Sequence, residues 1–112
     1  MYKRKKISVI ITTYNRPNNV IEIIKLLNKQ LNIPIDVEIL ICDSSSNGNL
    51  RLLNFIKSYN YLDIKYLNLK KNHQAFKRNK GAKHSQGDYL IFLDDDCFPE
   101  KYFLFNYYKK LK

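Results

Sequence analysis

Cysteine, glycine and proline are all scarce in this chain of 112 residues, which holds two cysteines, three glycines and three prolines. The two cysteines, Cys42 and Cys97, are too few for a disulfide framework and lack the spacing of metal ligands, so we expect reduced thiols. Because glycine and proline are few and 45% of the residues are hydrophobic, the composition excludes disordered and fibrous proteins. The length predicts one small globular domain over residues 1–112.

Long apolar runs are also missing. No stretch reaches the roughly 20 apolar residues that a transmembrane helix needs. The basic start at residues 1–6 leads directly into the apolar run ISVII, with no small-residue cleavage site after it. We therefore expect neither a membrane span nor a signal peptide, and a cytoplasmic location.

Acidic side chains number 10 against 20 lysines and arginines, which gives a formal net charge of +10. An excess of this size favours a polyanionic partner, such as nucleic acid, an acidic membrane surface or a phosphorylated ligand. A solvated, lysine-rich surface explains the same charge equally well. Peripheral attachment to a membrane therefore stays open beside the cytoplasmic location.

Hydrophobic periodicity predicts strands that alternate with helices. Short apolar runs predict strands at residues 6–12, 37–42, 64–69 and 89–93. Apolar residues at helical spacing predict helices at residues 18–31, 50–59, 74–85 and 99–111. We expect the run YLIFL at residues 89–93 to be buried on both faces and residues 64–69 to form an edge strand. We also expect Gly87 to end a helix in the left-handed conformation.

This alternation indicates an α/β fold with a mostly parallel, Rossmann-like sheet. With the strand order 3-2-1-4, the loops at residues 13–16, 43–48 and 94–96 would face one crevice at the carboxyl edge of the sheet. The same order brings Cys42 and Cys97 to that edge. The glycine-rich fingerprints G-x-G-x-x-G and G-x-x-x-x-G-K-[ST] are absent, which argues against a dinucleotide-dependent dehydrogenase and a P-loop NTPase.

Three consecutive carboxylates, Asp94, Asp95 and Asp96, follow the last predicted strand directly. Side by side at a sheet edge they repel one another, and a divalent cation among them would remove this cost. Mg²⁺ and Mn²⁺ prefer oxygen ligands, commonly carboxylates together with water and substrate phosphates. The cluster therefore predicts a metal–diphosphate site, and the alternative is that these residues cap a helix beginning near Pro99.

Four stretches carry a family resemblance, and their order and spacing span nearly the whole chain. They are ISVIITTYNRP at residues 7–17, EILICDSSSNG at 38–48, KRNKGAKHSQGDYL at 77–90 and IFLDDD at 91–96. Together they resemble the nucleotide-sugar-binding half of family 2 glycosyltransferases, which are inverting enzymes of the GT-A fold. The stretch IFLDDD resembles the DxD motif of that family.

The resemblance implies two groups of site residues. The nucleotide-binding group comprises Thr13, Tyr14, Asn15, Arg16, Asp43, Arg78, Asp94 and Asp95. The metal-binding group, which would hold Mn²⁺ or Mg²⁺, comprises Asp94 and Asp96. Asp43 would accept a hydrogen bond from the base, and Arg78 would lie near the diphosphate, which suits a guanidinium. From the residues alone, Asp43 also fits an Asx turn or helix cap, and Arg78 an exposed helix charge.

The resemblance also implies a nucleotide-diphospho-sugar donor, with a UDP-sugar favoured, and leaves the acceptor open. Cys42 stands where the family often has an aspartate, and His73 and Gln74 stand where it often has glycine. The general base of the family lies downstream of the DxD strand, so we assign none here. We interpret the chain as truncated one helix after that strand, or as completed by another chain. The aromatic last helix is then expected to expose a face and to associate with another surface.

Two other functions remain compatible with these residues. A binding module would hold a nucleotide or sugar nucleotide without turnover. A basic nucleic-acid-binding protein is the third possibility, although it gives the clustered aspartates no purpose. Such a protein would use exposed tyrosines together with Lys70, Lys71, Lys77, Arg78, Lys80 and Lys83.

Overall fold

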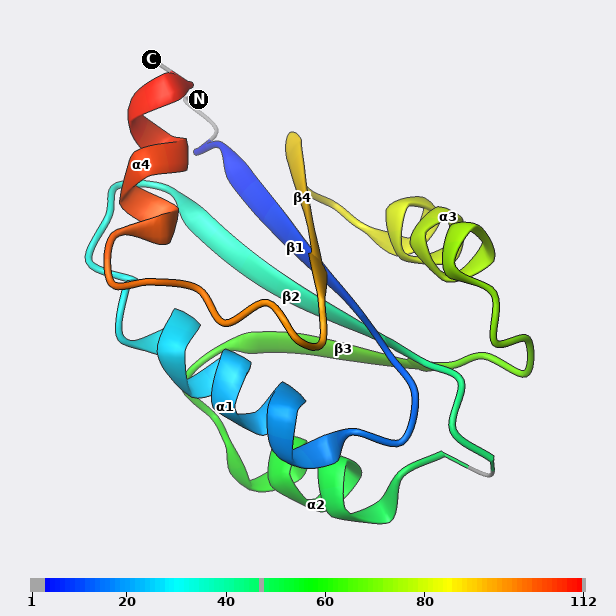
Figure 1. The fold of residues 1–112 in the computed structure, drawn as a ribbon. Coiled ribbons are helices and arrows are strands. Elements are labelled where there is room, and N and C mark those ends of the chain that lie inside the picture. Colours follow the sequence, from blue (N-terminus) through cyan, green and yellow to red (C-terminus); the bar gives the residue numbers. More distant parts are fainter. Residues whose placement is uncertain (1–3, 47, 112) are drawn as a thin grey trace.

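The computed structural model describes residues 4–46 and 48–111. In this part of the chain strands alternate with helices: β1 (Lys6–Thr13), α1 (Pro17–Asn28), β2 (Asp36–Asp43), α2 (Leu50–Ser58), β3 (Asp63–Asn68), α3 (Gln74–His84), β4 (Tyr89–Asp94) and α4 (Phe103–Lys110). The strands form a parallel sheet in the order β3-β2-β1-β4 (Figure 1). The predicted α/β class, parallel sheet and strand order are confirmed.

The register of the sheet aligns the ends of its strands. Thr13 of β1 lies beside Asp43 of β2, and Thr12 of β1 lies beside Asp94 of β4. Asp43 in turn pairs with Asn68 of β3. Because all these strands run in one direction, their last residues meet at the carboxyl edge, where open α/β sheets bind ligands.

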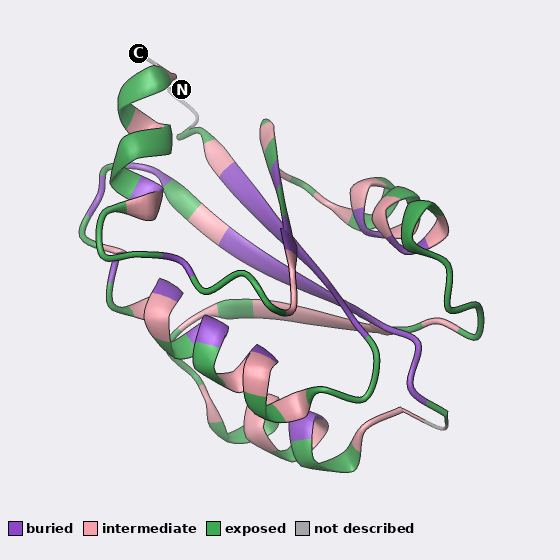
Figure 2. Ribbon diagram, in the orientation of Figure 1, coloured by how far each residue is buried: buried purple, intermediate pink, exposed green. Residues whose placement is uncertain are grey.

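Helices cover both faces of the sheet (Figures 1 and 2). On one face, isoleucine, valine and leucine side chains of the strands pack with residues of α1, α2 and α4, including Leu52 and Leu104. On the other face α3 covers a smaller buried cluster of Ile10, Leu40 and Cys42. The β-branched residues that dominate the strands suit this packed, pleated surface.

Strand β4 is buried on one face only, so the expectation of burial on both faces is wrong. Ile91 and Leu93 belong to the larger core, whereas Leu90 and Phe92 are 40% and 45% exposed. The cause is the position of α3, which packs over β1 and β2 and leaves the same face of β4 uncovered. β4 therefore forms one edge of the described sheet, and β3 forms the other, as predicted.

Helices α1 and α4 are shorter than predicted. α1 ends at Asn28 rather than near Leu31, and α4 begins at Phe103 rather than near Pro99. The idea that the three aspartates cap α4 is therefore wrong, because this helix starts seven residues after Asp96 and has no side-chain cap. The other predicted elements agree to within one residue at each end. No helix among the described residues has the length and apolar character that crossing a membrane requires.

The buried side chain of Gln30 explains why α1 ends earlier, and α4 begins later, than predicted. Its amide nitrogen donates to Glu100 O at 2.7 Å, and its carbonyl oxygen accepts from Leu104 N at 2.9 Å. The first turn of a helix has free N–H groups, and here one of them is satisfied from a distant loop instead of a local cap. The chain leaves α1 early enough to bring this amide to α4.

Helix α4 exposes part of its aromatic face, as predicted. Leu104 is fully buried, whereas Phe105 and Tyr107 are 43% and 41% exposed. Association through this helix stays a prediction.

Gly87 does not adopt the left-handed conformation, so that prediction is wrong. α3 ends at His84, and Ser85 continues in an extended conformation. A Cβ atom on Gly87 would overlap Ser8 Oγ and would lie 2.7 Å from Ser8 N. Glycine is required because the chain passes so close to β1, where Gly87 N donates to Ser8 Oγ at 2.8 Å.

A buried carboxylate ties this segment to the sheet. Glu38 is fully buried; its Oε2 accepts from Ser8 Oγ (2.5 Å) and Gln86 N (2.6 Å), and its Oε1 lies 2.9 Å from Lys65 Nζ. Burial acts to raise the pKa of Glu38, but the donors outweigh it and hold the pKa below its ordinary value of 4.5. Glu38 thereby helps to hold the start of β4 against β1.

The sign of this shift predicts how stability depends on pH. Because the pKa of Glu38 is lower in the folded chain, its stabilisation is present above about pH 4.5 and is lost as the pH falls through the folded value. Glu38→Gln should lower the free energy of unfolding by about 1–3 kcal/mol at neutral pH. Urea denaturation should show this difference shrinking toward about pH 3. Glu22→Gln, exposed on α1, is the control, and a pH-independent difference would contradict the network.

Gly81 gives a second test, because it faces the sheet from within α3. A Cβ atom there would lie 2.5 Å from Ile10 Cγ2 and 2.9 Å from Cys42 Sγ. Alanine normally favours a helix by about 1 kcal/mol over glycine, but overpacking costs about 1–3 kcal/mol. Gly81→Ala should therefore destabilise the chain to urea, whereas Asn79→Ala, exposed on the same helix, should not. A more stable Gly81→Ala protein would argue against this packing.

Candidate functional site

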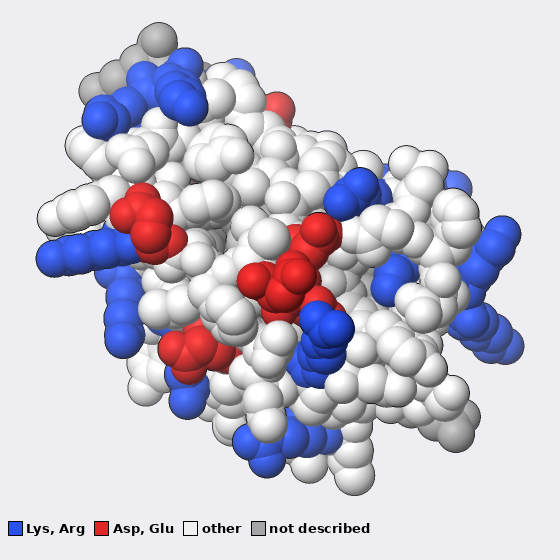
Figure 3. All heavy atoms as spheres, in the orientation of Figure 1, with Lys and Arg blue, Asp and Glu red and all other residues white. Residues whose placement is uncertain are grey.

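A cavity of about 390 Å³ lies at the carboxyl edge of the sheet, between the ends of β1 and β4 and the start of α3. It is lined by Thr12, Thr13, Tyr14, Arg16, Gln74, Lys77, Asp94, Asp95 and Asp96. Six predicted site residues are among these, whereas Asn15, Asp43 and Arg78 lie outside the lining. Acidic side chains gather near the end of β4 with basic side chains beside them (Figure 3). A larger cavity of about 500 Å³, at the amino ends of the strands, has no acidic lining residue.

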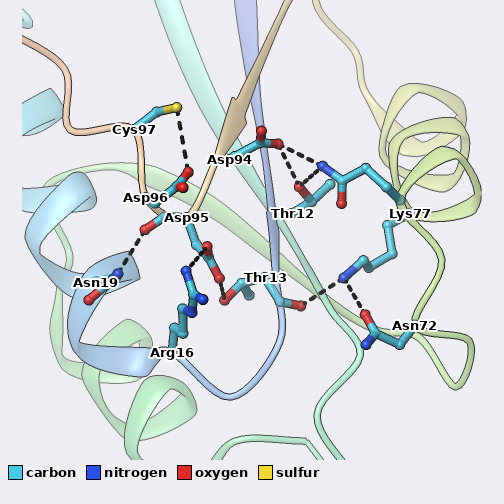
Figure 4. Close-up of polar contacts among 11 residues, drawn as sticks. Thr12, Thr13, Arg16, Asn19, Asn72, Lys77, Asp94, Asp95, Asp96 and Cys97 are labelled. Carbon is cyan, nitrogen blue, oxygen red and sulfur yellow. Dashed lines mark hydrogen bonds and ion pairs between the residues drawn. The ribbon is translucent and has the colours of Figure 1, made fainter.

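The middle carboxylate, Asp95, is held by the protein itself (Figure 4). Its Oδ2 accepts from Thr13 Oγ1 at 2.9 Å, and its Oδ1 pairs with Arg16 NH1 at 3.2 Å. Its backbone carbonyl accepts from Asn19 Nδ2 at 3.1 Å, and its side chain is only 14% exposed. Asp95 thus braces the start of α1 against the end of β4.

Asp94 is more open, with a side chain that is 46% exposed. Its Oδ1 accepts from Gln74 Nε2 at 2.6 Å and from Arg78 NH2 at 3.3 Å, with Thr12 Oγ1 at 3.4 Å. Gln74 also donates to Thr12 Oγ1 at 2.8 Å, so it bridges β1 and β4 from α3. These roles of Gln74 and Thr12 were not predicted. The only signal in the sequence is that Gln74 stands where the family often has glycine.

Asp96 is exposed, and its Oδ1 accepts from Cys97 Sγ at 3.7 Å. One carboxylate oxygen from each of Asp94 and Asp96 and the Cys97 sulfur lie within 4.8 Å of one another. Two open carboxylates suit a hard divalent cation such as Mg²⁺ or Mn²⁺, whereas a thiol suits softer metals. The oxygen donors of Asp94 and Asp96 therefore fit the predicted cation.

Asp43 is fully buried beneath the loop that follows β2. Its Oδ1 accepts from Ser45 N (2.9 Å) and Ser45 Oγ (2.5 Å), and its Oδ2 accepts from Tyr66 OH (2.5 Å). The bond to Ser45 N is that of an Asx turn, and Ser45 Oγ also accepts from Asn15 N at 2.9 Å. Burial and the bond to Asp43 hold the pKa of Tyr66 above its usual range. In this geometry Asp43 orders two loops, and its contact with a base stays a prediction.

Lys77 is buried, so its assignment to an exposed basic surface is wrong. The side chain is 4% exposed, and Nζ donates to Asn72 Oδ1 (2.9 Å), Ser44 Oγ (3.2 Å) and Thr13 O (3.3 Å). Lys77 and Gly81 form the buried residues of α3, one turn apart. The i, i+4 spacing of these two residues was the available sequence signal of burial. It is a weak signal, because a lysine on a polar helix is ordinarily exposed.

Both cysteines are free thiols. Cys97 is exposed, and Cys42 is buried under α3. Burial raises the pKa of Cys42 to about 11, although the Lys77 ammonium opposes the shift.

A parallel α/β sheet with a polar cavity at its carboxyl edge defines a ligand-binding α/β protein. The chain belongs to glycosyl transferase family 2, whose model matches residues 8–112. It is 38% identical over 111 residues to poly(ribitol-phosphate) beta-N-acetylglucosaminyltransferase TarP of Staphylococcus aureus, with 95% of this chain and 34% of TarP covered. It is 31% identical over 109 residues to the hyaluronan synthase of Pasteurella multocida, with 94% and 11% covered.

Solved structures share the fold. S. aureus TarS 1-349 in complex with UDP-GlcNAc superposes with a TM-score of 0.76 at 27% identity, over 93% of this chain and 30% of that one. Mannosyltransferase PcManGT from Pyrobaculum calidifontis, in complex with GDP-Man and Mn²⁺, superposes with a TM-score of 0.78 at 19% identity, over 97% and 33%. The chain thus spans about a third or less of the length of these proteins.

The different surroundings of the aspartates predict different effects of removing their charge. Asp95→Asn should lower the free energy of unfolding by about 1–3 kcal/mol, because it weakens the bonds to Thr13 and Arg16. Asp96→Asn, at an exposed position, should change it by no more than about 0.5 kcal/mol. Urea denaturation of both variants measures this, and equal effects would contradict the bracing role of Asp95.

Proposed function

We propose that this chain binds a nucleotide-diphospho-sugar at the carboxyl edge of its sheet and forms the donor-binding part of an inverting glycosyltransferase. The observation that carries the proposal is the cavity in which Thr13 and Tyr14 lie together with the aspartates at the end of β4. Membership of family 2 supports a glycosyl donor. The likeness to TarS, solved with UDP and with UDP-GlcNAc, supports a UDP-sugar.

The nucleoside would lie against the loop that follows β1. Tyr14 is 44% exposed there and presents an aromatic surface to the cavity. Asn15 adopts a left-handed backbone with φ of 53° and is anchored through its N–H to Ser45. Because Asp95 bonds to Thr13 and Arg16 at the two ends of this loop and Ser45 anchors Asn15 between them, little ordering is left for the ligand to impose.

The diphosphate would lie nearer α3 and the end of β4. The Arg78 side chain is 43% exposed, and its NH2 contacts Asp94 Oδ1 at 3.3 Å, beside the end of β4. A guanidinium with spare donors suits phosphate oxygens. We propose that Asp94 and Asp96 hold Mg²⁺ or Mn²⁺, which when bound would neutralise charge on the departing nucleoside diphosphate.

Calorimetric titration with UDP and UDP-GlcNAc, with and without Mn²⁺, tests the proposal. The chain should bind both ligands in a metal-dependent manner, and Asp96→Ala should weaken this binding at least about tenfold, equivalent to about 1.4 kcal/mol. Glu22→Ala removes a similar charge from an exposed position on α1 and should bind as the unaltered chain does.

Failure of the folded chain to bind any nucleoside diphosphate would overturn the proposal. Tight, strongly salt-dependent binding of a polynucleotide would instead favour the nucleic-acid-binding alternative. Equal binding by Asp96→Ala and the unaltered chain would remove Asp96 from the metal site.

A further inference from the structure

We propose that Lys77 is a positioning residue that holds three segments at the carboxyl edge of the sheet in one arrangement. Its Nζ contacts the carbonyl of Thr13 at the end of β1 and the side chain of Asn72 before α3 (Figure 4). It also contacts the hydroxyl of Ser44 after β2. Thr13 is the last residue of β1, whereas Ser44 and Asn72 lie in the connections that follow β2 and β3. One side chain therefore joins distant parts of the sequence, since Thr13 and Ser44 are 31 residues apart and Ser44 and Asn72 are 28 apart.

The hydrogen-bond count assigns Lys77 to positioning rather than to direct ligand contact. A lysine ammonium has three N–H donors, and the three protein acceptors lie 2.9, 3.2 and 3.3 Å away. With the side chain only 4% exposed, all three donors are used within the protein. A ligand in the cavity would meet the segment that begins at Thr13, which Lys77 holds, and its phosphates would meet Arg78 instead.

The charge of Lys77 also has a place in this arrangement. Burying an ammonium is unfavourable unless hydrogen bonds and opposite charges compensate for it. Burial lowers the pKa of Lys77 below its ordinary value, and the nearby carboxylates of Asp95, Asp43 and Asp94 oppose this shift. The ammonium thus offsets carboxylate repulsion beneath the cavity while it orders the loops.

Loss of the ammonium should make the loops more mobile without disrupting the sheet. Ser44 N would still donate to Thr13 O at 3.2 Å, and the strand pairings would be unaffected. Asn72 would lose the lysine and keep its bond from Ser44 Oγ at 2.9 Å. The expected change is therefore local to the three connections at the carboxyl edge.

Hydrogen exchange of the chain tests this directly, with Lys77→Met compared with Lys83→Met. The control removes one lysine charge from an exposed position on the same helix. Lys77→Met should speed amide exchange about tenfold in residues 14–16, 44–46 and 70–73 together, and should leave the central strands unchanged. Faster exchange in one loop alone, or equally throughout the chain, would overturn the proposal. If Lys77→Met does not fold, Lys77→Gln, which keeps amide donors, takes its place in the comparison.

The consequence for binding rests on the proposed function and is read separately. Lys77→Met should weaken the binding of uridine and of UDP by the same factor of about ten, because the ordered loops would contact the nucleoside that both ligands share. A greater loss for UDP would indicate direct phosphate contact, and unchanged affinity for both would indicate a purely structural lysine; either result overturns the positioning role. If the unaltered chain binds neither ligand, the proposed function fails, and hydrogen exchange still decides whether Lys77 orders the loops.

Discussion

The pairing of β1 with a parallel strand on each side is the constraint on which the site depends. It sets Thr13 beside Asp43 and Thr12 beside Asp94, so residues far apart in the sequence meet at one edge. A slip of one residue would turn Asp94 to the opposite face of the sheet. The register is secured at the other end of β4, where Gly87 passes close to Ser8. A contact at the amino end of the sheet therefore governs the geometry of the carboxyl end.

The fold offsets electrostatic repulsion among the clustered aspartates by placing them in different environments. Asp95 is nearly buried and is bonded by Thr13 and Arg16, which makes it part of the framework. Asp94 and Asp96 remain open toward the solvent. Two cationic side chains face this region, Arg16 from the loop before α1 and Arg78 from α3. Three adjacent identical residues can thus serve different purposes because the fold gives each a different set of neighbours.

The sequence was sufficient for the features that local pattern determines. Short β-branched runs and helical spacing located every described strand and helix, and alternation led to the parallel sheet and its order. Features that depend on distant contacts were not predictable in this way. The ends of α1 and α4 depend on Gln30 meeting Leu104, and the exposure of Phe92 depends on where α3 packs.

In the candidate site, too, some features follow from the sequence pattern and others depend on distant contacts. The expected residues of the β1 and β4 ends do gather around one cavity, because strand order alone brings them together. The burial of Lys77 was not predicted because it depends on acceptors in three separate segments, and the i, i+4 spacing to Gly81 is too weak a signal by itself. The bridging role of Gln74 was not predicted because its partners, Thr12 and Asp94, lie on other elements.

The unequal burial of the two cysteines makes the folded chain its own chemical reporter. An alkylating reagent meets Cys97 at the surface, whereas Cys42 lies beneath α3 in the smaller core and has a pKa of about 11. A second equivalent of label can therefore be taken up only when α3 lifts from the sheet. The rate of that second alkylation measures how often the helix carrying Lys77 and Arg78 leaves its place, without any added probe.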